Sequence, residues 1–381
     1  MDKGSNLHYE GEANESRDSF KLDREDMRVA QLDHHIRILG ILRAYICRSR
    51  NQIVAINCLP FEVLSQIFVL GNIASELDSG PVQPTVFPLI LGSVCYKWRC
   101  VAWGSSELWE SFHCRISKAR CDAQAMILRG WLQRSQQRML SICISIRDED
   151  AWTESSNVST SIIDAIVPYC ERWTHLGLIL PEAWYQSLNQ AQGKVPNLAS
   201  LSIRPPMSTS PPLSFGTFAQ ATSIRSFFAS HYDLANIHLR WDVLKKVVLE
   251  GVTTNEAIDV IRRGESITSC RFNELGALEH DFPRITNNSS IQDLEISTDE
   301  WADLDEFLDF LVLPGLRSLT VTLPEGHPDP LFTIEALISR STCPLKSVDI
   351  RGVEITDEDL IAFVSHSDTV TTIRVRHHAS Q

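Results

Sequence analysis

Residues 316–321 read Leu-Arg-Ser-Leu-Thr-Val, with apolar side chains at the first, fourth and sixth positions. This spacing occurs nine times in the chain, this copy included, and successive copies start 20 to 29 residues apart. In a strand, the fourth and sixth positions of the copy point to one face. Each copy would leave an apolar edge that only its neighbour can cover, so the pattern predicts stacked parallel strands. The copies begin at Trp173, Leu198, Ile224, Leu244, Ile267, Ile291, Leu316, Leu345 and Val370.

This spacing and period are the signature of leucine-rich repeats. The intervals leave room for helices, and two of them carry a helix start, with Thr254 before 255–261 and Thr356 before 357–364. Residues 299–312 and 334–340 fill the same slot elsewhere. Val252 and Val353 stand where such repeats usually have Asn or Cys, so we expect an irregular solenoid. Alternation places ten residues on its concave face: Ser200, Ser202, Lys246, Val248, Asp293, Glu295, Ser318, Thr320, Ser347 and Asp349.

A different pattern occupies the region before the repeats. Pro60 stands at a favourable first helical position, apolar residues follow on one face, and Gly71 is an expected stop. Residues 71–88 carry turn signals and predict a loop. A second helix is predicted from Leu89 to Trp103. About fifty residues with two helices close a core poorly, so their exposed apolar face is a candidate partner site.

Three blocks in this region resemble an F-box, as found in the F-box proteins abundant in mushroom-forming fungi. They are Leu59-Pro60-x-Glu62-Val63-Leu64-x-x-Ile67-Phe68, then Val94-Cys95-x-x-Trp98-Arg99-x-Val101-Ala102, then Leu108-Trp109. The resemblance covers about residues 56–113. In the same fungal proteins, the segment 139–146 would be the first strand of the repeat domain.

The resemblance implies a non-catalytic substrate receptor of an SCF-type cullin–RING ubiquitin ligase, in the ubiquitin-like conjugation pathway. The F-box would bind a Skp-type adaptor and through it a cullin, and the repeats would bind an unidentified protein substrate. The alternative is a leucine-rich-repeat scaffold without a ligase role, in which the helical segment caps the solenoid. The implied adaptor contacts are Leu59, Pro60, Val63, Leu64, Ile67, Phe68, Val94, Cys95 and Trp98. In the lone chain, Pro60, Leu64 and Phe68 should keep partly exposed apolar surface.

The N-terminal segment divides in two. Residues 1–20 are polar and predict a disordered tail. Residues 21–55 predict an amphipathic helix, with one apolar stripe formed by Leu32, Ile36, Leu39, Leu42 or Arg43, Ile46 and Ile53. Two interpretations stay open: the helix docks on the domain that follows it, or it is a short dimerisation helix.

Composition limits the function classes. The net charge is −13, which argues against a nucleic-acid partner, and no apolar run is long enough to cross a membrane. Residues 291–381 hold 17 acidic and 6 basic residues. This acidic excess predicts either a solvated outer face of helices or a surface for a basic partner. The ten cysteines lack metal-ligand spacing and predict buried, reduced thiols, so we expect a cytoplasmic or nuclear protein. No nucleotide-binding or hydrolase motif occurs, so we expect no enzyme activity, cofactor or metal.

The predicted fold class is therefore α/β. The expected layout is a tail (1–20), an amphipathic helix (21–55), an all-α F-box domain (56–113), and an irregular leucine-rich-repeat solenoid with a parallel sheet (114–381).

Overall fold

A computed structural model describes residues 7–79, 86–153, 159–205, 214–279, 285–367 and 369–376. The fold is mixed α/β, and the chain forms two compact units. The helical unit comprises Met1–Ala74 and Phe87–Ser105, and the sheet unit comprises Ser75–Val86 and Ser106–Gln381. The segment Ser106–His113, which the sequence assigned to the helical domain, thus belongs with the sheet.

The helical unit begins with one long helix, α1 (Leu7–Gln52). The tail expected to be disordered over 1–20 is therefore helical from Leu7 onwards, and residues 1–6 lie outside the described part. The segment 7–20 contains no Pro and several good helix formers, so the helix can extend backwards from the apolar stretch. After α1 come the short 3-10 helix η1 (Ala55–Cys58), α2 (Phe61–Ser79), α3 (Phe87–Val94) and α4 (Tyr96–Gly104).

Helix α2 does not stop at Gly71 as expected but continues to Ser79. Gly71 instead lets the ring of Phe87 lie close to the backbone of α2, because a Cβ built at residue 71 would lie 2.9 Å from Cζ of Phe87. The loop predicted over 71–88 is thus confined to the residues between α2 and α3, of which 80–85 lie outside the described part.

The helix predicted over 89–103 is split into α3 and α4 at Cys95. Cys95 has extended backbone angles and acts as the N-cap of α4, with its Sγ accepting from the backbone N–H of Trp98 at 3.5 Å. Since cysteine is not among the residues that favour N-caps, the sequence carried no clear signal for this break.

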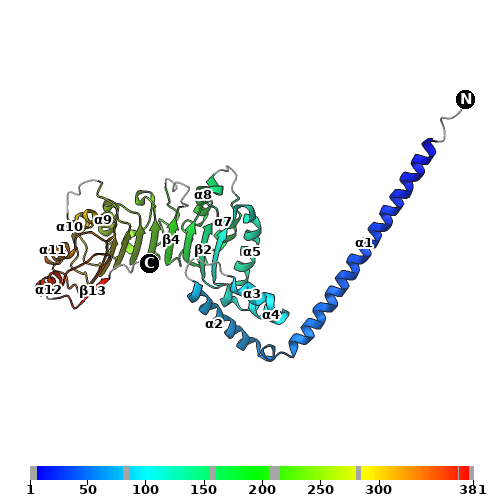
Figure 1. The fold of residues 1–381 in the computed structure, drawn as a ribbon, viewed down its shortest axis with the longest axis horizontal. Coiled ribbons are helices and arrows are strands. Elements are labelled where there is room, and N and C mark those ends of the chain that lie inside the picture. Colours follow the sequence, from blue (N-terminus) through cyan, green and yellow to red (C-terminus); the bar gives the residue numbers. More distant parts are fainter. Residues whose placement is uncertain are drawn as a thin grey trace. The chain divides into compact units, whose positions relative to one another are not determined.

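The sheet unit contains an 11-stranded parallel sheet in the order β1-β2-β3-β4-β5-β6-β7-β9-β11-β12-β13. Within this sheet the spatial order of the strands is their order in the chain, with β8 and β10 left out, so the strands in Figure 1 follow the order of the colour bar. The strands are β1 (Ser111–Ile116), β2 (Leu140–Ile146), β3 (Trp173–Ile179), β4 (Ser200–Arg204), β5 (Ser226–Ser230), β6 (Lys246–Glu250), β7 (Ser269–Asn273), β9 (Asp293–Ser297), β11 (Ser318–Thr322), β12 (Ser347–Arg351) and β13 (Thr372–Arg376). A separate pair is formed by β8 (Thr286–Asn287) and β10 (Leu311–Val312).

All nine copies of the apolar spacing run into a strand of this sheet, and their parallel pairing confirms the expected parallel sheet. The fourth and sixth positions of each copy are buried, apart from the half-buried Ile373 and Val375 in the last strand. These side chains form the core on one face, and the alternating positions form a second face, here called the open face.

Helices fill most of the intervals between strands. They are α5 (Cys121–Arg134), α6 (Asp150–Thr153), α7 (Ser161–Ile166), α8 (Glu182–Leu188), α9 (Thr254–Arg263), α10 (Trp301–Asp309), α11 (Leu331–Ser341) and α12 (Asp357–His366). The shorter 3-10 helices are η2 (Ser106–Trp109), η3 (Lys118–Arg120), η4 (Val167–Arg172), η5 (Asn189–Ala191), η6 (Leu234–Asn236) and η7 (Trp241–Val243).

Two of the helix starts were expected from the sequence. Thr356 is the N-cap of α12, as expected, and its side chain accepts from the N–H of Asp359. At α9 the cap is Thr253, one residue before the expected Thr254, and it forms a capping box with Glu256. Thr254 is instead buried and donates to the carbonyl of Gly276.

The cysteines only partly match the expectation of buried thiols. All ten are free, but Cys121, Cys170, Cys270 and Cys343 alone are buried. Within the described residues, no helix is both long and apolar enough to span a bilayer.

Candidate functional site

The first candidate surface is an apolar row along α2. Val63, Ile67 and Leu70 follow at steps of four and three, which places them on one side of the helix. They are 45%, 44% and 65% exposed. Pro60, just before the helix, is also exposed. Leu70 was not anticipated, although its spacing from Ile67 could have indicated it.

Two residues expected to show partial exposure on this helix are buried instead. Leu64 is 0% exposed and Phe68 is 2% exposed. The Phe68 ring lies 4.9 Å from the ring of Trp98 on α4, so it packs α2 against α4. The expectation that Leu64 and Phe68 keep exposed apolar surface is therefore wrong, because both point to the inner side of α2. Pro60 alone of that set is exposed.

A second apolar row lies on α3. Ile90 and Val94 are four residues apart, and each is 54% exposed. The sequence singled out Val94 but not Ile90. The remaining predicted contacts, Leu59, Cys95 and Trp98, are half-buried. Of the nine predicted residues, four are thus exposed, three are half-buried and two are buried.

A polar cluster fixes the backbone that leads into α2. The side chain of Asn57 accepts from Nε1–H of Trp98 at 2.8 Å and donates from Nδ2 to the carbonyl of Asn51 at 2.8 Å. The ammonium of Lys97 donates to the backbone carbonyls of Asn57 and, at 2.9 Å, of Leu59. Residues from α4 therefore hold the segment that carries Leu59 and Pro60.

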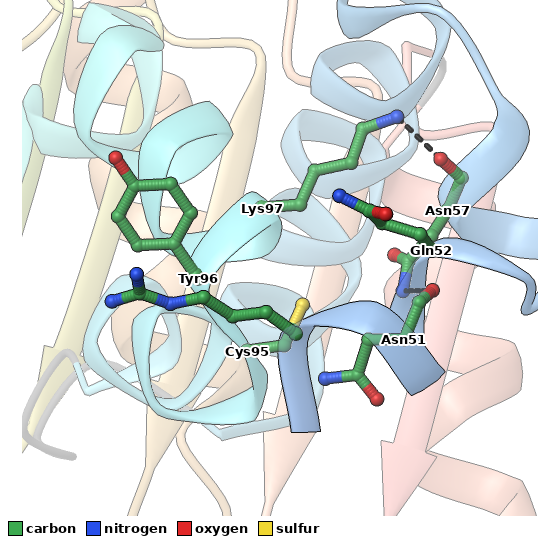
Figure 2. A pocket seen from close by; sticks show the side chains of 7 residues that line it. Asn51, Gln52, Asn57, Cys95, Tyr96 and Lys97 are labelled. Atoms are coloured by element: carbon green, nitrogen blue, oxygen red, sulfur yellow. Dashed lines mark hydrogen bonds between the residues drawn. The ribbon is translucent and has the colours of Figure 1, made fainter. Parts of the chain in front are cut away.

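The same cluster forms one wall of a pocket of about 410 Å³. Figure 2 shows Lys97 reaching toward Asn57, with Asn51 and Gln52 on the neighbouring chain segment. At the other side, the Arg48 guanidinium lies 4.5 Å from the centre of the Tyr96 ring. The lining consists of three amides, one thiol, one phenol and two cations, with no carboxylate among the lining residues, so it suits hydrogen-bond acceptors.

The second candidate surface is the open face of the sheet. The residues at the middle of each strand are paired in register and form a row across this face. The charge of this middle row changes along the sheet. From β2 to β6 the row is uncharged, and from β7 to β13 it is mostly charged. The row reads Cys143, Gly177, Ser202, Phe228, Val248, Arg271, Glu295, Thr320, Asp349 and Arg374. All ten residues expected on the concave face stand at open-face positions of their strands.

Ion pairs link the charged half of the open face. Glu295 lies 2.6 Å from Arg271 and 3.5 Å from Arg351. Asp349 lies 2.8 Å from Arg351 and 3.4 Å from Arg376. Asp349 is buried beneath these arginines, at 6% exposure. The surface therefore offers alternating charges rather than a field of one sign, in contrast to the acidic excess of the whole C-terminal quarter.

The thiols of the sheet unit are not activated. Burial raises the pKa of Cys114 to about 11 and that of Cys270 to about 12. Burial also raises the pKa of Cys143, which stands on the open face. These thiols stay protonated at neutral pH. Among the residues that the structure describes, no group of three or more His, Cys, Asp or Glu side chains is placed to hold a metal ion.

Comparison with known proteins gives no assignment, because no protein-family model and no curated protein matches the chain.

Proposed function

We propose that this chain is a non-catalytic substrate receptor of an SCF-type cullin–RING ubiquitin ligase. The helical unit would be the F-box that binds a Skp-type adaptor, and the sheet unit would be an irregular leucine-rich-repeat solenoid that binds a protein substrate. The observation that carries the proposal is the exposed row of Val63, Ile67 and Leu70, on the helix that begins with the F-box-like string.

The size of the apolar row suits a partner site. Full burial of such a side chain stabilises by roughly 1.5–3 kcal/mol. Val63 and Ile67 are a little under half exposed, so about 1 kcal/mol remains for each on binding a partner, and somewhat more remains for Leu70. Together with Ile90 and Val94 the gross gain reaches about 5 kcal/mol, which association entropy would partly offset. A stable complex would then also need polar contacts.

The open face of the sheet would receive the substrate. Its uncharged half carries Phe228 and Val248, and its charged half carries the paired Arg271, Glu295 and Arg351. A segment with apolar residues followed by charges of both signs would complement this order. Ten free cysteines support a reducing compartment, the cytoplasm or the nucleus.

One observation favours a second function, a repeat scaffold with no ligase role. Leu64 and Phe68 are sealed inside the protein, which is what a structural helical cap would require. The two functions differ in what they demand of the exposed row, since a cap needs no partner there.

The test is recovery of a purified Skp-type adaptor by the full chain. A Val63→Asp, Ile67→Asp variant should lose the adaptor, because both charges would stand on the binding row while the buried residues stay intact. The matched control is Phe332→Asp, an equally apolar-to-charged change at a residue of α11 that is 81% exposed. The control should bind like wild type. Equal recovery by all three proteins would refute the F-box assignment and leave the scaffold.

A further inference from the structure

Helix α1 carries an apolar surface that nothing in the described chain covers. Every residue from Arg24 to Arg50 is exposed. The interpretation that this helix docks on the domain after it therefore holds at most for its C-terminal end, where Arg48 stacks on Tyr96 of α4. Large apolar side chains among them are between 40% and 70% exposed: Met27, Val29, Leu32, Ile36, Ile38, Leu39, Ile41, Leu42, Tyr45 and Ile46.

Eight of these ten residues form two stripes on opposite sides of the helix. The inner stripe is Ile38, Ile41 and Tyr45, and one turn further on the same side stands Arg48, which stacks on Tyr96 of α4. That side of α1 therefore faces the rest of the helical unit at its C-terminal end. The outer stripe lies on the opposite side, away from this contact. It consists of Val29, Leu32, Ile36, Leu39 and Ile46.

The outer stripe has the spacing of a coiled coil. Its residues alternate in steps of three and four, which corresponds to heptad positions a and d. The a positions hold the β-branched Val29 and Ile36, and the d positions in between hold Leu32 and Leu39. β-branched residues at a with Leu at d favour two parallel strands. Arg43 falls at the next a position, where a two-stranded seam leaves its long side chain a path to water.

Charges beside the stripe specify the same arrangement. Arg28 stands at position g and Asp33 at position e of the following heptad, and within its own helix Arg28 also lies 2.6 Å from Glu25. In a parallel pair, Arg28 of one helix meets Asp33 of the other, and the symmetry of the pair makes this contact twice. An antiparallel pair would bring position e of one helix beside position e of the other, so it would not form the Arg28–Asp33 contact.

We propose that this chain forms a parallel homodimer through the outer stripe of α1, between Val29 and Ile46. The partner that covers the stripe is a second copy of this chain. Two features support this: the alternation of β-branched residues and Leu suits pairing with an identical helix, and Arg28 of one copy complements Asp33 of the other. Since parallel helices end at the same side, the two copies of the segment after Gln52 emerge together. The inference does not depend on the ligase proposal, because it concerns a different face of a different helix.

The test is the mass of the full chain by sedimentation over a wide range of concentrations. Wild type should shift with concentration from 43.0 kDa toward about twice that mass. A Leu32→Asp, Leu39→Asp variant should stay monomeric throughout. The matched control is Ile38→Asp, Ile41→Asp on the inner stripe, which should dimerise like wild type. A monomeric wild type, or equal loss of dimer in both variants, would overturn the proposal.

A charge swap tests the parallel register without touching the apolar seam. Arg28→Asp places two like charges at each contact and should weaken the dimer several-fold. Adding Asp33→Arg to that variant restores opposite charges and should recover the wild-type dissociation constant. If the double variant dimerises no better than Arg28→Asp alone, the parallel register is wrong. Circular dichroism of each variant should show that the helix content is unchanged.

Discussion

Replacing Asn57 with Ala should loosen the segment that leads into α2. The change leaves Nε1–H of Trp98 without its acceptor and removes one of two donors to the carbonyl of Asn51, which still accepts from the backbone N–H of Val54. A buried donor without a partner costs roughly 1–3 kcal/mol, and we take about 1 kcal/mol because Trp98 is only half-buried. The second hydrogen bond adds about 1 kcal/mol. The total of about 2 kcal/mol corresponds to a roughly thirtyfold rise in the population of the open segment.

Hydrogen exchange measured by mass spectrometry would report this opening in peptides that cover 54–60 and 96–103. The matched variant Asn57→Asp keeps an oxygen for Trp98 and loses only the donor to Asn51, so its exchange should rise about fivefold. Peptides from the sheet unit should exchange as in wild type. If Asn57→Ala exchanged like wild type, or Asn57→Asp were as severe as Asn57→Ala, the polar cluster would not hold this segment.

Three further predictions follow from burial, helix geometry and charge. Leu319→Ala, at a fully buried position in the interior strand β11, should lower the free energy of unfolding by about 3 kcal/mol. Ile373→Ala, at a half-buried position in the edge strand β13, should lower it by about 1 kcal/mol. Equal losses of the two variants in urea unfolding would contradict the idea that each strand is buried by its neighbours. Gly40→Ala should stabilise α1 by up to about 1 kcal/mol, seen as raised helix content on heating, because a Cβ there meets no atom within 4 Å. Burial and two neighbouring carboxylates raise the pKa of Asp303, so its ionised form costs stability. Asp303→Asn should therefore raise the melting temperature at pH 7, and this gain should vanish below the ordinary carboxyl pKa of 3.8.

The strands could be predicted from the sequence because their pattern is repeated and strict. Each apolar copy from Trp173 to Val370 runs into a strand, and the open-face positions follow from alternation alone. The pairing of Arg271 with Glu295 could also have been found, because both occupy the same position of adjacent copies. The first strand, β1, was not among the nine copies, and the expected domain boundary after His113 cuts through it.

The helical unit was harder to predict because its signals are ambiguous. A glycine in the sequence can indicate either the end of a helix or a close contact with another residue. Gly71 lies in close contact with Phe87 and does not end α2. The apolar residues of α2 lie on both sides of the helix, so composition could not separate the buried Leu64 and Phe68 from the exposed Val63 and Ile67. Only the position of Trp98 decides which side is inside.

The most direct test of the proposed function is hydrogen exchange of the full chain with and without a purified Skp-type adaptor. The account predicts protection in peptides that cover 59–70 and 87–94, where Val63, Ile67 and Val94 are exposed. It predicts no change in peptides from β9 to β12. Protection confined to the open face of the sheet, or no protection anywhere at saturating adaptor, would contradict it.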